Sequence, residues 1–545
     1  MNPRLALYLL AALAGLYTMA PITDGDLFWN LNIGRWMLDN LALLPADDPF
    51  TYNAQPGGVQ HEWLLQVIFA AVESFAGLNG LRALGGLIGA ASIVLVYVVF
   101  VRRGIAAGDA VVAAALWWIV VEPHAVLRPH LAGWLFALAV IGIGFESCHK
   151  KNENKRLVAL FIACVVWGNA HASVLIAPAY AGLFLVGRVL AAVSGRGDRA
   201  TVSVWAKRVA ATGAGAMIQP AHVLLIPYAL STPAINKELS FEWWPLLRAD
   251  VWVSRPGVLI VWGLLVVAVI AVAALQLRAP SEDCAGASDP SGTSSAPVHD
   301  FPGVLVAAFA LAHAALTRRM TVFLFIPMLL IARAFMSRVE PAGLLAARVR
   351  ALLPWIAVVF VVFQYGTGAR AALRVRPLVA AAFPIDSTAF LRETKLDGRL
   401  FNPDGWGGYI AWRVPGRRVF ADGRWPLVGG GVIHDGFEIM LRRKPTEPLH
   451  DKYRIDSAIF RLAEYMRVPG PDPKQWVLAW RDELSVVMLR RGPFFAANVE
   501  RTCDFYRRFE GARDRARWAV TVRAPQGVVS PTAAPSVLDL CAPAE

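Results

Sequence analysis

The chain has 545 residues, of which 56% are hydrophobic and 17% charged, and its formal net charge is +13. Soluble domains carry more charge and fewer apolar residues, so this composition excludes an ordinary soluble enzyme and indicates a polytopic membrane protein. The excess of Lys and Arg is typical of cytoplasmic loops facing anionic lipid, and no nucleic-acid-binding pattern is present. The expected partner is therefore the lipid bilayer and no nucleic acid.

Apolar segments approach bilayer length at about eleven places along the chain. They are residues 4–20, 83–101, 107–121, 131–147, 156–169, 172–193, 207–229, 256–278, 301–317, 320–336 and 351–367. The first resembles a signal peptide, but no convincing cleavage site precedes Asp24, so we expect a retained helix. Segment 64–77 is also apolar, but it is short and carries Gln66 and Glu73.

The distribution of basic residues predicts the topology. With a cytoplasmic N-terminus and 64–77 lying along the outer surface, most basic clusters fall inside, as the positive-inside rule expects. If 64–77 crossed, Lys150 and Lys151 would move outside and this bias would be lost. We therefore expect about eleven crossings of the cytoplasmic (inner) membrane. Arg318 and Arg319 remain on the outer side, which makes them functional candidates.

Two later segments differ from the apolar ones. Residues 281–300 are rich in Ser, Gly, Ala and Pro and predict a disordered cytoplasmic linker. Residues 375–545 have soluble composition, with expected strands at 399–402, 418–421 and 484–489 and helices near 386–394 and 455–467. The predicted fold is an α-helical membrane domain, residues 1–370 including the outer loop 21–63, followed by an extracytoplasmic α/β domain, residues 375–545.

The cysteines agree with this topology. Cys148, Cys164 and Cys284 fall in membrane or cytoplasmic positions, whereas Cys503 and Cys541 fall in the outer domain, where oxidation is possible. We predict a disulfide between Cys503 and Cys541.

The segment Pro21-Ile-Thr-Asp-Gly-Asp-Leu-Phe-Trp29 places Asp24 and Asp26 just after the first apolar helix. The following run has Trp29, Ile33, Trp36 and Met37 on one face, which predicts an interfacial helix. One aspartate is explained as the cap of that helix, but a cap does not explain both. The other interpretation is a general base for an acceptor hydroxyl, with or without a divalent ion such as Mg or Mn held by Asp24 and Asp26.

Further polar residues follow in this loop and in the next outer turns. His61 and Glu62 are secondary candidates, equally explained by surface solvation, and Asp47-Asp48 before Pro49 is better explained as a turn. The later outer turns contribute Arg128, His130, His171, Lys237, Glu242, Arg318 and Arg319. Any one of these is typical of a helix cap or a packing residue. Their repetition in four turns indicates one cavity that opens to the outer side of the membrane. Its cations would bind a phosphate group, and its carboxylates would act on the acceptor substrate.

The stretch Asp24-Gly-Asp-Leu-Phe-Trp-Asn-Leu-Asn-Ile-Gly-Arg-Trp36, continuing through His61-Glu-Trp-Leu64 and Gly77-Leu-Asn-Gly-Leu-Arg82, resembles the GT-C superfamily of membrane glycosyltransferases. The resemblance implies that Asp26 or Asp24 is the catalytic base and that the donor is a polyprenyl-phosphate-linked sugar. The chain departs from relatives that have adjacent Asp-Glu or His-Pro-Pro at these places. Gly407-Gly-Tyr409 and Ala421-Asp-Gly-Arg424 look like patterns of uncharacterised members without assigned chemistry, the latter best explained as a turn with an ion pair.

Two other functions compete with a transferase. A transporter or flippase for lipid-linked glycans should carry charges near the middle of the membrane and repeated or broken helices, whereas the candidates here sit at helix ends. A non-catalytic assembly protein would tolerate loss of Asp24 and Asp26. We expect a glycosyltransferase acting on an extracytoplasmic lipid, glycan or protein.

Overall fold

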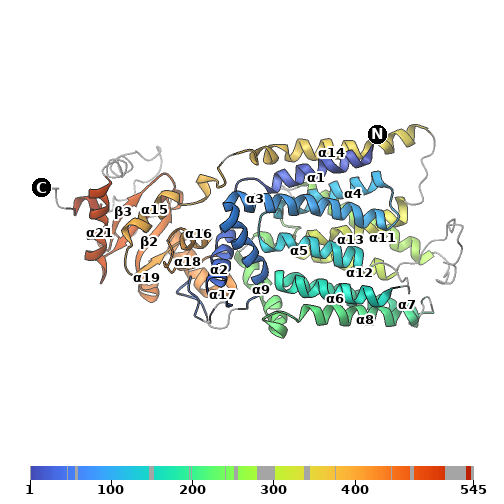
Figure 1. Ribbon diagram of the computed structural model, residues 1–545, viewed down its shortest axis with the longest axis horizontal. Coiled ribbons are helices and arrows are strands. Elements are labelled where there is room, and N and C mark those ends of the chain that lie inside the picture. The colour runs from blue at the N-terminus through green and yellow to red at the C-terminus, as the bar shows by residue number, and fades with distance from the viewer. Residues whose placement is uncertain are drawn as a thin grey trace. The chain divides into compact units, whose positions relative to one another are not determined.

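The computed structural model describes residues 2–43, 45, 47–55, 59–145, 152–195, 197, 199–239, 241–250, 256–278, 301–336, 344–374, 376–442, 445–466, 472–509 and 536–541. The chain folds into two compact units (Figure 1). Unit 1 comprises Met1–Pro21, Val59–Leu65 and Phe75–Pro377, and unit 2 comprises Ile22–Gly58, Gln66–Ser74 and Leu378–Glu545. The expected linker 281–300, Cys148 and Cys284 lie outside the described residues.

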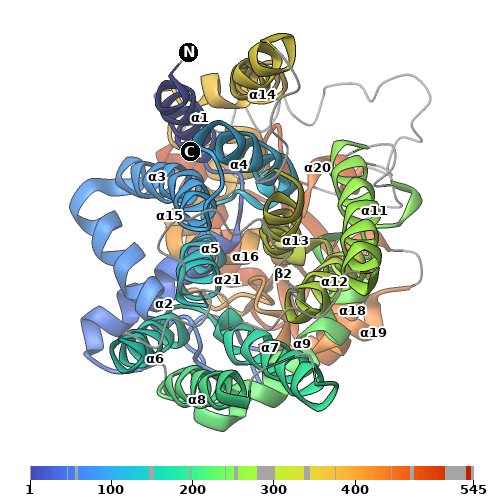
Figure 2. The ribbon, with the colours of Figure 1, turned by 90° about the vertical axis from the view of Figure 1, so that its right-hand side faces the viewer.

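Unit 1 is a bundle of apolar helices, seen end-on in Figure 2. It is built from α1 (Pro3–Thr18), α3 (Trp63–Arg102, of which Gln66–Ser74 belong to unit 2), α4 (Ala107–Val121), α5 (Pro129–Ala137), α6 (Glu153–Ala170), α7 (Ile176–Val193), α8 (Arg199–Ala216), α9 (Leu225–Leu239), α11 (Pro256–Arg278), α12 (Phe301–Leu316), α13 (Phe325–Ile331) and α14 (Leu344–Ala371). Helices α6, α7 and α8 pack on one another, and α1 packs on α14.

Most predicted apolar segments are helices with similar bounds. The predicted helix 207–229 is wrong, because α8 ends at Ala216 and α9 begins only at Leu225. Gln219 interrupts the run: its side chain accepts a hydrogen bond from Ala221 N and donates one to His222 O. Among the described residues, four helices have both the length and the apolar character to cross a membrane, and four shorter helices are apolar. The chain is a membrane protein, and the count of eleven crossings stays a prediction.

Segment 64–77 is a helix that stops being regular at Gly77. The φ of Gly77 is +62°, so α3 is two helices merged across a kink. Only glycine adopts this left-handed conformation without a Cβ penalty. Just beyond the kink, the guanidinium of Arg82 donates to Met19 O and Ala372 O, so one side chain ties α3 to the ends of α1 and α14.

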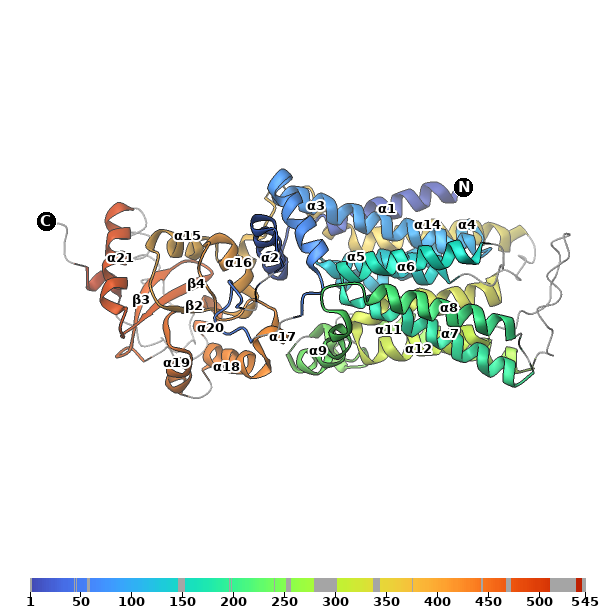
Figure 3. The ribbon, with the colours of Figure 1, turned by 60° about the horizontal axis from the view of Figure 1, so that its bottom comes forward.

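Unit 2 is an α/β domain with a four-stranded sheet in the order β1-β2-β4-β3. The strands are β1 (Arg399–Phe401), β2 (Ile455–Arg461), β3 (Trp476–Arg481) and β4 (Ser485–Arg490); β1 pairs with β2 in parallel, and the other pairs are antiparallel. Figure 3 shows α15 (Ile385–Thr394) on one side of the strands and α19 (Glu447–Tyr453) on the other. Helices α16 (Asp404–Arg413) and α21 (Phe495–Arg508) join α15 around the main hydrophobic core.

Unit 2 corrects two predicted elements. Residues 455–467 are not a helix: β2 occupies Ile455–Arg461, followed by the short α20 (Leu462–Tyr465). The β2 strand is almost fully buried and lies between β1 and β4, so sheet pairing overrides helical preference. Residues 418–421 form no strand of the sheet; Val419 makes only isolated bridges, to Thr51 and Leu400.

The loop after the first helix also departs from expectation. The sequence groups 21–63 with the membrane domain, whereas Ile22–Gly58 packs with unit 2. Helix α2 (Asp26–Asn40) contacts α16, and its expected interfacial face is partly buried there, with Ile33 2% and Met37 5% exposed. Helix α2 thus packs within unit 2, while Leu38 near its end and Leu41 just after it expose their apolar side chains. Its position at a membrane interface stays a prediction.

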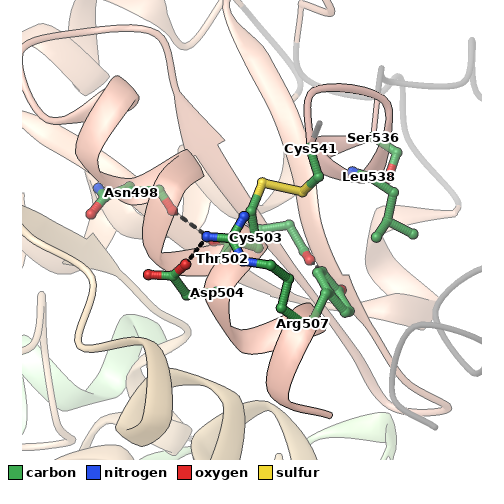
Figure 4. Close-up of a disulfide and its surroundings, with 10 residues drawn as sticks. Asn498, Thr502, Cys503, Asp504, Arg507, Ser536, Leu538 and Cys541 are labelled. Carbon is green, nitrogen blue, oxygen red and sulfur yellow. Dashed lines mark hydrogen bonds and ion pairs between the residues drawn. A yellow bond between two sulfur atoms is a disulfide. The ribbon is translucent and has the colours of Figure 1, made fainter. Parts of the chain in front are cut away.

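Cys503 and Cys541 form a disulfide, the pairing predicted from the sequence, with a Cα–Cα distance of 5.4 Å (Figure 4). It joins α21 to Cys541, which follows the short 3-10 helix Val537–Asp539. The remaining described cysteine, Cys164, is buried and free.

Candidate functional site

Several turns of unit 1 gather around the carboxylate of Glu62. Glu62 Oε1 lies 3.3 Å from His171 Nε2 and 3.5 Å from His61 Nε2. His171 is fixed by Ser173, whose backbone N–H donates to Nδ1, so the Nε2–H points to Glu62. Next to it, Trp63 Nε1 donates to Asn169 Oδ1 at 2.6 Å. The predicted residues His61, Glu62 and His171 thus come together.

The electrostatics of this group favour an ionised Glu62. Burial alone would raise the pKa of Glu62, but His61, His171 and Arg319 together lower it to about 2. Burial lowers the pKa of His171 to about 4, despite the opposing charge of Glu62. For His61, burial is outweighed by Glu62, so its pKa rises above the ordinary value. A carboxylate with so low a pKa is a weak base, so Glu62 is suited to orienting imidazoles rather than accepting a proton.

A second carboxylate, Glu242 of the turn Phe241–Trp243, collects arginines from two other turns. Arg128 Nη1 lies 3.5 Å and Arg319 Nη1 3.8 Å from Glu242 Oε2. The Arg319 distance is too long for a hydrogen bond, so its guanidinium is held by charge and by the ring of Trp243, 5.6 Å away. Burial opposes ionisation of Glu242, but Arg128, Arg319 and His124 lower its pKa. Arg319 also acts on Glu62 and so links the two groups.

Arg318 lies in a neighbouring cluster with Asp250, Arg248 and Trp244. Its Nη2 lies 3.3 Å from Asp250 Oδ2, and Arg248 Nε lies 3.1 Å from Asp250 Oδ1. The indole of Trp244 lies 3.6 Å from the guanidinium carbon of Arg248 and 5.8 Å from that of Arg318. Lys237 lies in α9, and its side chain is outside the described part of the chain.

His124 and His130 are buried beside these arginines. His130 Nε2 donates to the backbone oxygen of His124 at 2.9 Å, which makes His130 Nδ1 the acceptor nitrogen. That atom has no hydrogen-bond partner among the described residues. Burial, with the charges of nearby arginines, lowers the pKa of His124 to about 4, so it is neutral at pH 7. A neutral His130 in this tautomer offers an acceptor to a ligand, which suits a hydroxyl better than a phosphate oxygen.

The aspartate pair lies in unit 2, at the start of α2. Asp24 Oδ1 accepts a hydrogen bond from Asp26 N at 2.9 Å, so Asp24 satisfies a free N–H of the first helical turn. The N-cap position itself is Gly25, and Asp24, one residue earlier, supplies the side-chain acceptor for the start of the helix. The Asp26 side chain projects from the first residue of α2 and is half-buried.

A buried ion triad holds the Ala421-Asp-Gly-Arg424 motif. Arg424 donates to Asp422 Oδ2 at 2.6 Å and to Asp48 Oδ2 at 2.5 Å, and the three side chains are 9%, 0% and 5% exposed, respectively. The expected turn with an ion pair is confirmed. Sequence reasoning missed Asp48, which was predicted as a turn residue; it accepts from Phe50 N and Thr51 N and also pairs with Arg424. No local signal could have found this partner, which is 376 residues away.

The predicted divalent metal has no supporting donor set in the described chain. Among the described residues, no group of three or more His, Cys, Asp or Glu side chains is arranged to hold a metal ion. A metal-binding role of Asp24 and Asp26 stays a prediction.

Comparison with solved structures identifies the architecture. The Archaeoglobus fulgidus oligosaccharyltransferase, solved with Zn and sulfate, matches with a TM-score of 0.54 and 13% identity, over 89% of this chain and 73% of that one. ArnT from Cupriavidus metallidurans, bound to undecaprenyl phosphate, matches with a TM-score of 0.52 and 13% identity, over 89% and 96%. Its apo form matches with a TM-score of 0.52 and 14% identity.

The chain shares the fold of these solved structures, the oligosaccharyltransferase and ArnT. At such low identity the likeness concerns the fold alone, and it agrees with the resemblance carried by the first outer loop. No family model and no curated protein sequence matches the chain.

Proposed function

We propose that the protein is a glycosyltransferase that moves a sugar from a polyprenyl-phosphate donor to a hydroxyl or amine on an extracytoplasmic lipid, glycan or protein. The observation that carries the proposal is the convergence of Arg128, Glu242 and Arg319 from separate turns of unit 1, within a GT-C fold. One neighbour was solved with undecaprenyl phosphate, so the fold accommodates such a lipid in that protein.

The arginines are the proposed ligands of the donor phosphate. Among the described residues, no carboxylate oxygen lies within hydrogen-bond distance of Arg319. The Arg319 guanidinium can therefore donate hydrogen bonds to a phosphate oxygen. Arg318, Arg128 and Lys237 would add charge around it. His171 is already engaged by Glu62, and His130 offers an acceptor, so we give both histidines a positioning role rather than direct phosphate contact.

Asp26 is the proposed general base. The acceptor oxygen or nitrogen attacks the anomeric carbon of the sugar while the Asp26 carboxylate takes its proton. The bond from that carbon to the phosphate oxygen breaks, and the electron pair leaves with the phosphate, whose charge the arginines stabilise. Asp24 is proposed only as the group that fixes the start of α2.

The proposed setting is the cytoplasmic membrane, with unit 2 outside the cytoplasm, as the basic loops predict. Cys503–Cys541 supports this placement, because disulfides persist in oxidising compartments.

The test compares envelope glycolipids, glycans and glycoproteins by mass spectrometry in a null strain complemented with wild type, Asp26→Asn or Asp24→Asn. We expect a sugar-sized mass increment with wild type and Asp24→Asn but none with Asp26→Asn, at equal protein levels in the membrane. Identical profiles with wild type and Asp26→Asn would remove the catalytic aspartate from the proposal. They would favour a transporter or an assembly protein instead.

A further inference from the structure

The carboxylate of Asp26 lies directly against the Asp-Gly-Arg turn, defined as Asp422–Arg424. A Cβ built on Gly423 would stand 2.5 Å from Asp26 Oδ1 and 3.5 Å from Trp29 Cδ1. Real Cβ contacts are essentially never that short, so a side chain at position 423 would force the Asp26 carboxylate to shift from its present position. The φ of Gly423 is +92°, a conformation that also favours glycine. Two separate features therefore require glycine at this position.

The turn itself is held from several sides. Arg424 is bound to Asp422 and Asp48 in the buried triad. On the other flank, Asn402 Nδ2 donates to Ala421 O at 2.8 Å, and Asn402 Oδ1 accepts from Phe420 N at 2.8 Å. A turn fixed by charge on one side and by hydrogen bonds on the other has little freedom to move away from Asp26.

The helix that carries Asp26, α2, packs tightly against α16. A Cβ on Gly25 would lie 2.0 Å from Gly405 O, and one on Gly408 would lie 2.7 Å from Trp29 N. Asn32 Nδ2 donates to Gly408 O at 3.0 Å. Helices α2 and α16 thus meet backbone to backbone, which leaves the Asp26 carboxylate a narrow range of positions above Gly423.

From this geometry we infer that the Asp-Gly-Arg turn is a positioning element for Asp26. Glycine at 423 leaves room for the carboxylate, and the triad of Asp48, Asp422 and Arg424 holds the turn in place. The inference rests on the proposed role of Asp26 as the base. The inference assigns a role to the Asp-Gly-Arg turn, which the sequence predicted only as a turn with an ion pair.

The test is Gly423→Ala, which adds one methyl group where the carboxylate lies. We expect kcat to fall by about 10²-fold, the loss typical of a displacement near 1 Å, with the KM for the lipid-linked donor unchanged. Gly416→Ala is the matched control: φ at Gly416 is +81°, and a Cβ there meets nothing within 4 Å. It carries the same backbone strain without the contact, so its kcat should stay close to wild type.

The outcomes separate the inference from its premise. If Asp26→Asn abolishes transfer but Gly423→Ala retains the kcat of Gly416→Ala, the positioning role is refuted and the proposed function stands. If Asp26→Asn transfers sugar at the wild-type rate, both are refuted. If Gly423→Ala does not fold, Gly423→Asn replaces it with Gly416→Asn as control, because Asn tolerates positive φ better and carries the same Cβ. Wild-type kcat in Gly423→Asn would then overturn the inference.

Discussion

Asp24 and Asp26 should respond differently to the same change from Asp to Asn. Asp24 uses one side-chain oxygen to accept the N–H of Asp26, and an asparagine Oδ1 can accept it as well. Asp24→Asn should therefore change the free energy of unfolding by less than about 0.5 kcal/mol and leave kcat near wild type. Asp24→Ala removes the acceptor and should cost about 1 kcal/mol of stability.

Asp26→Asn keeps the shape of the side chain but cannot take a proton at neutral pH. Loss of a general base typically lowers the rate by about 10²- to 10⁴-fold. That loss corresponds to roughly 3 to 5 kcal/mol on the activation barrier. Stability should stay near wild type, because the substitution changes neither the size of the side chain nor the backbone of α2.

The assay is single-turnover sugar transfer by the full chain in lipid nanodiscs, using the product identified in the complemented strains. Thermal unfolding followed by tryptophan fluorescence supplies the stability of each variant. An equal loss of rate in Asp24→Asn and Asp26→Asn would refute the division of roles. So would a loss in Asp26→Asn that merely follows a loss of folded protein.

Other regions give further expectations. Arg319→Ala should raise the KM for the donor by about tenfold, equivalent to about 1.4 kcal/mol. Arg318→Ala should raise it less, because Arg318 already forms an ion pair with Asp250. Unchanged donor kinetics in both variants would count against phosphate binding by these arginines. Arg424→Met leaves two buried carboxylates without their cation and should lower the unfolding free energy by about 3 to 5 kcal/mol. Arg418→Met is the control, because it breaks an exposed ion pair and should lower the unfolding free energy by at most about 1 kcal/mol in the same thermal assay. Burial lowers the pKa of His450 to about 4 in the folded state, whereas the unfolded chain binds the proton near the ordinary value of about 6.5. The unfolding free energy should therefore fall by roughly 3 kcal/mol as the pH drops from about 6.5 to 4. That decrease should be absent in His450→Gln, and an equal slope in this variant would show that other groups cause it.

The sequence by itself determined most of unit 1. An apolar run of bilayer length has few alternatives to a helix, because every backbone polar group must be satisfied within the segment. Segments 107–121 and 256–278 therefore match α4 and α11. The polar residues in the turns between helices also indicated where charge gathers, since charges are costly elsewhere in such a chain. The break at Gln219 was missed although a helix-breaking proline, Pro220, directly follows it in the sequence.

Only the tertiary structure decided the roles within unit 2. Two aspartates separated by one residue are equivalent in sequence, and the hydrogen bond from Asp26 N to Asp24 is what distinguishes them. Residues 455–461 became a strand because β1 and β4 flank them, and Arg424 became part of a triad because the fold brings Asp48 to it. Bilayer insertion acts on one segment at a time, so local composition is sufficient to predict it. Strand pairing, ion pairing and the space beside Gly423 depend on residues hundreds of positions apart, and the sequence does not show which of them meet.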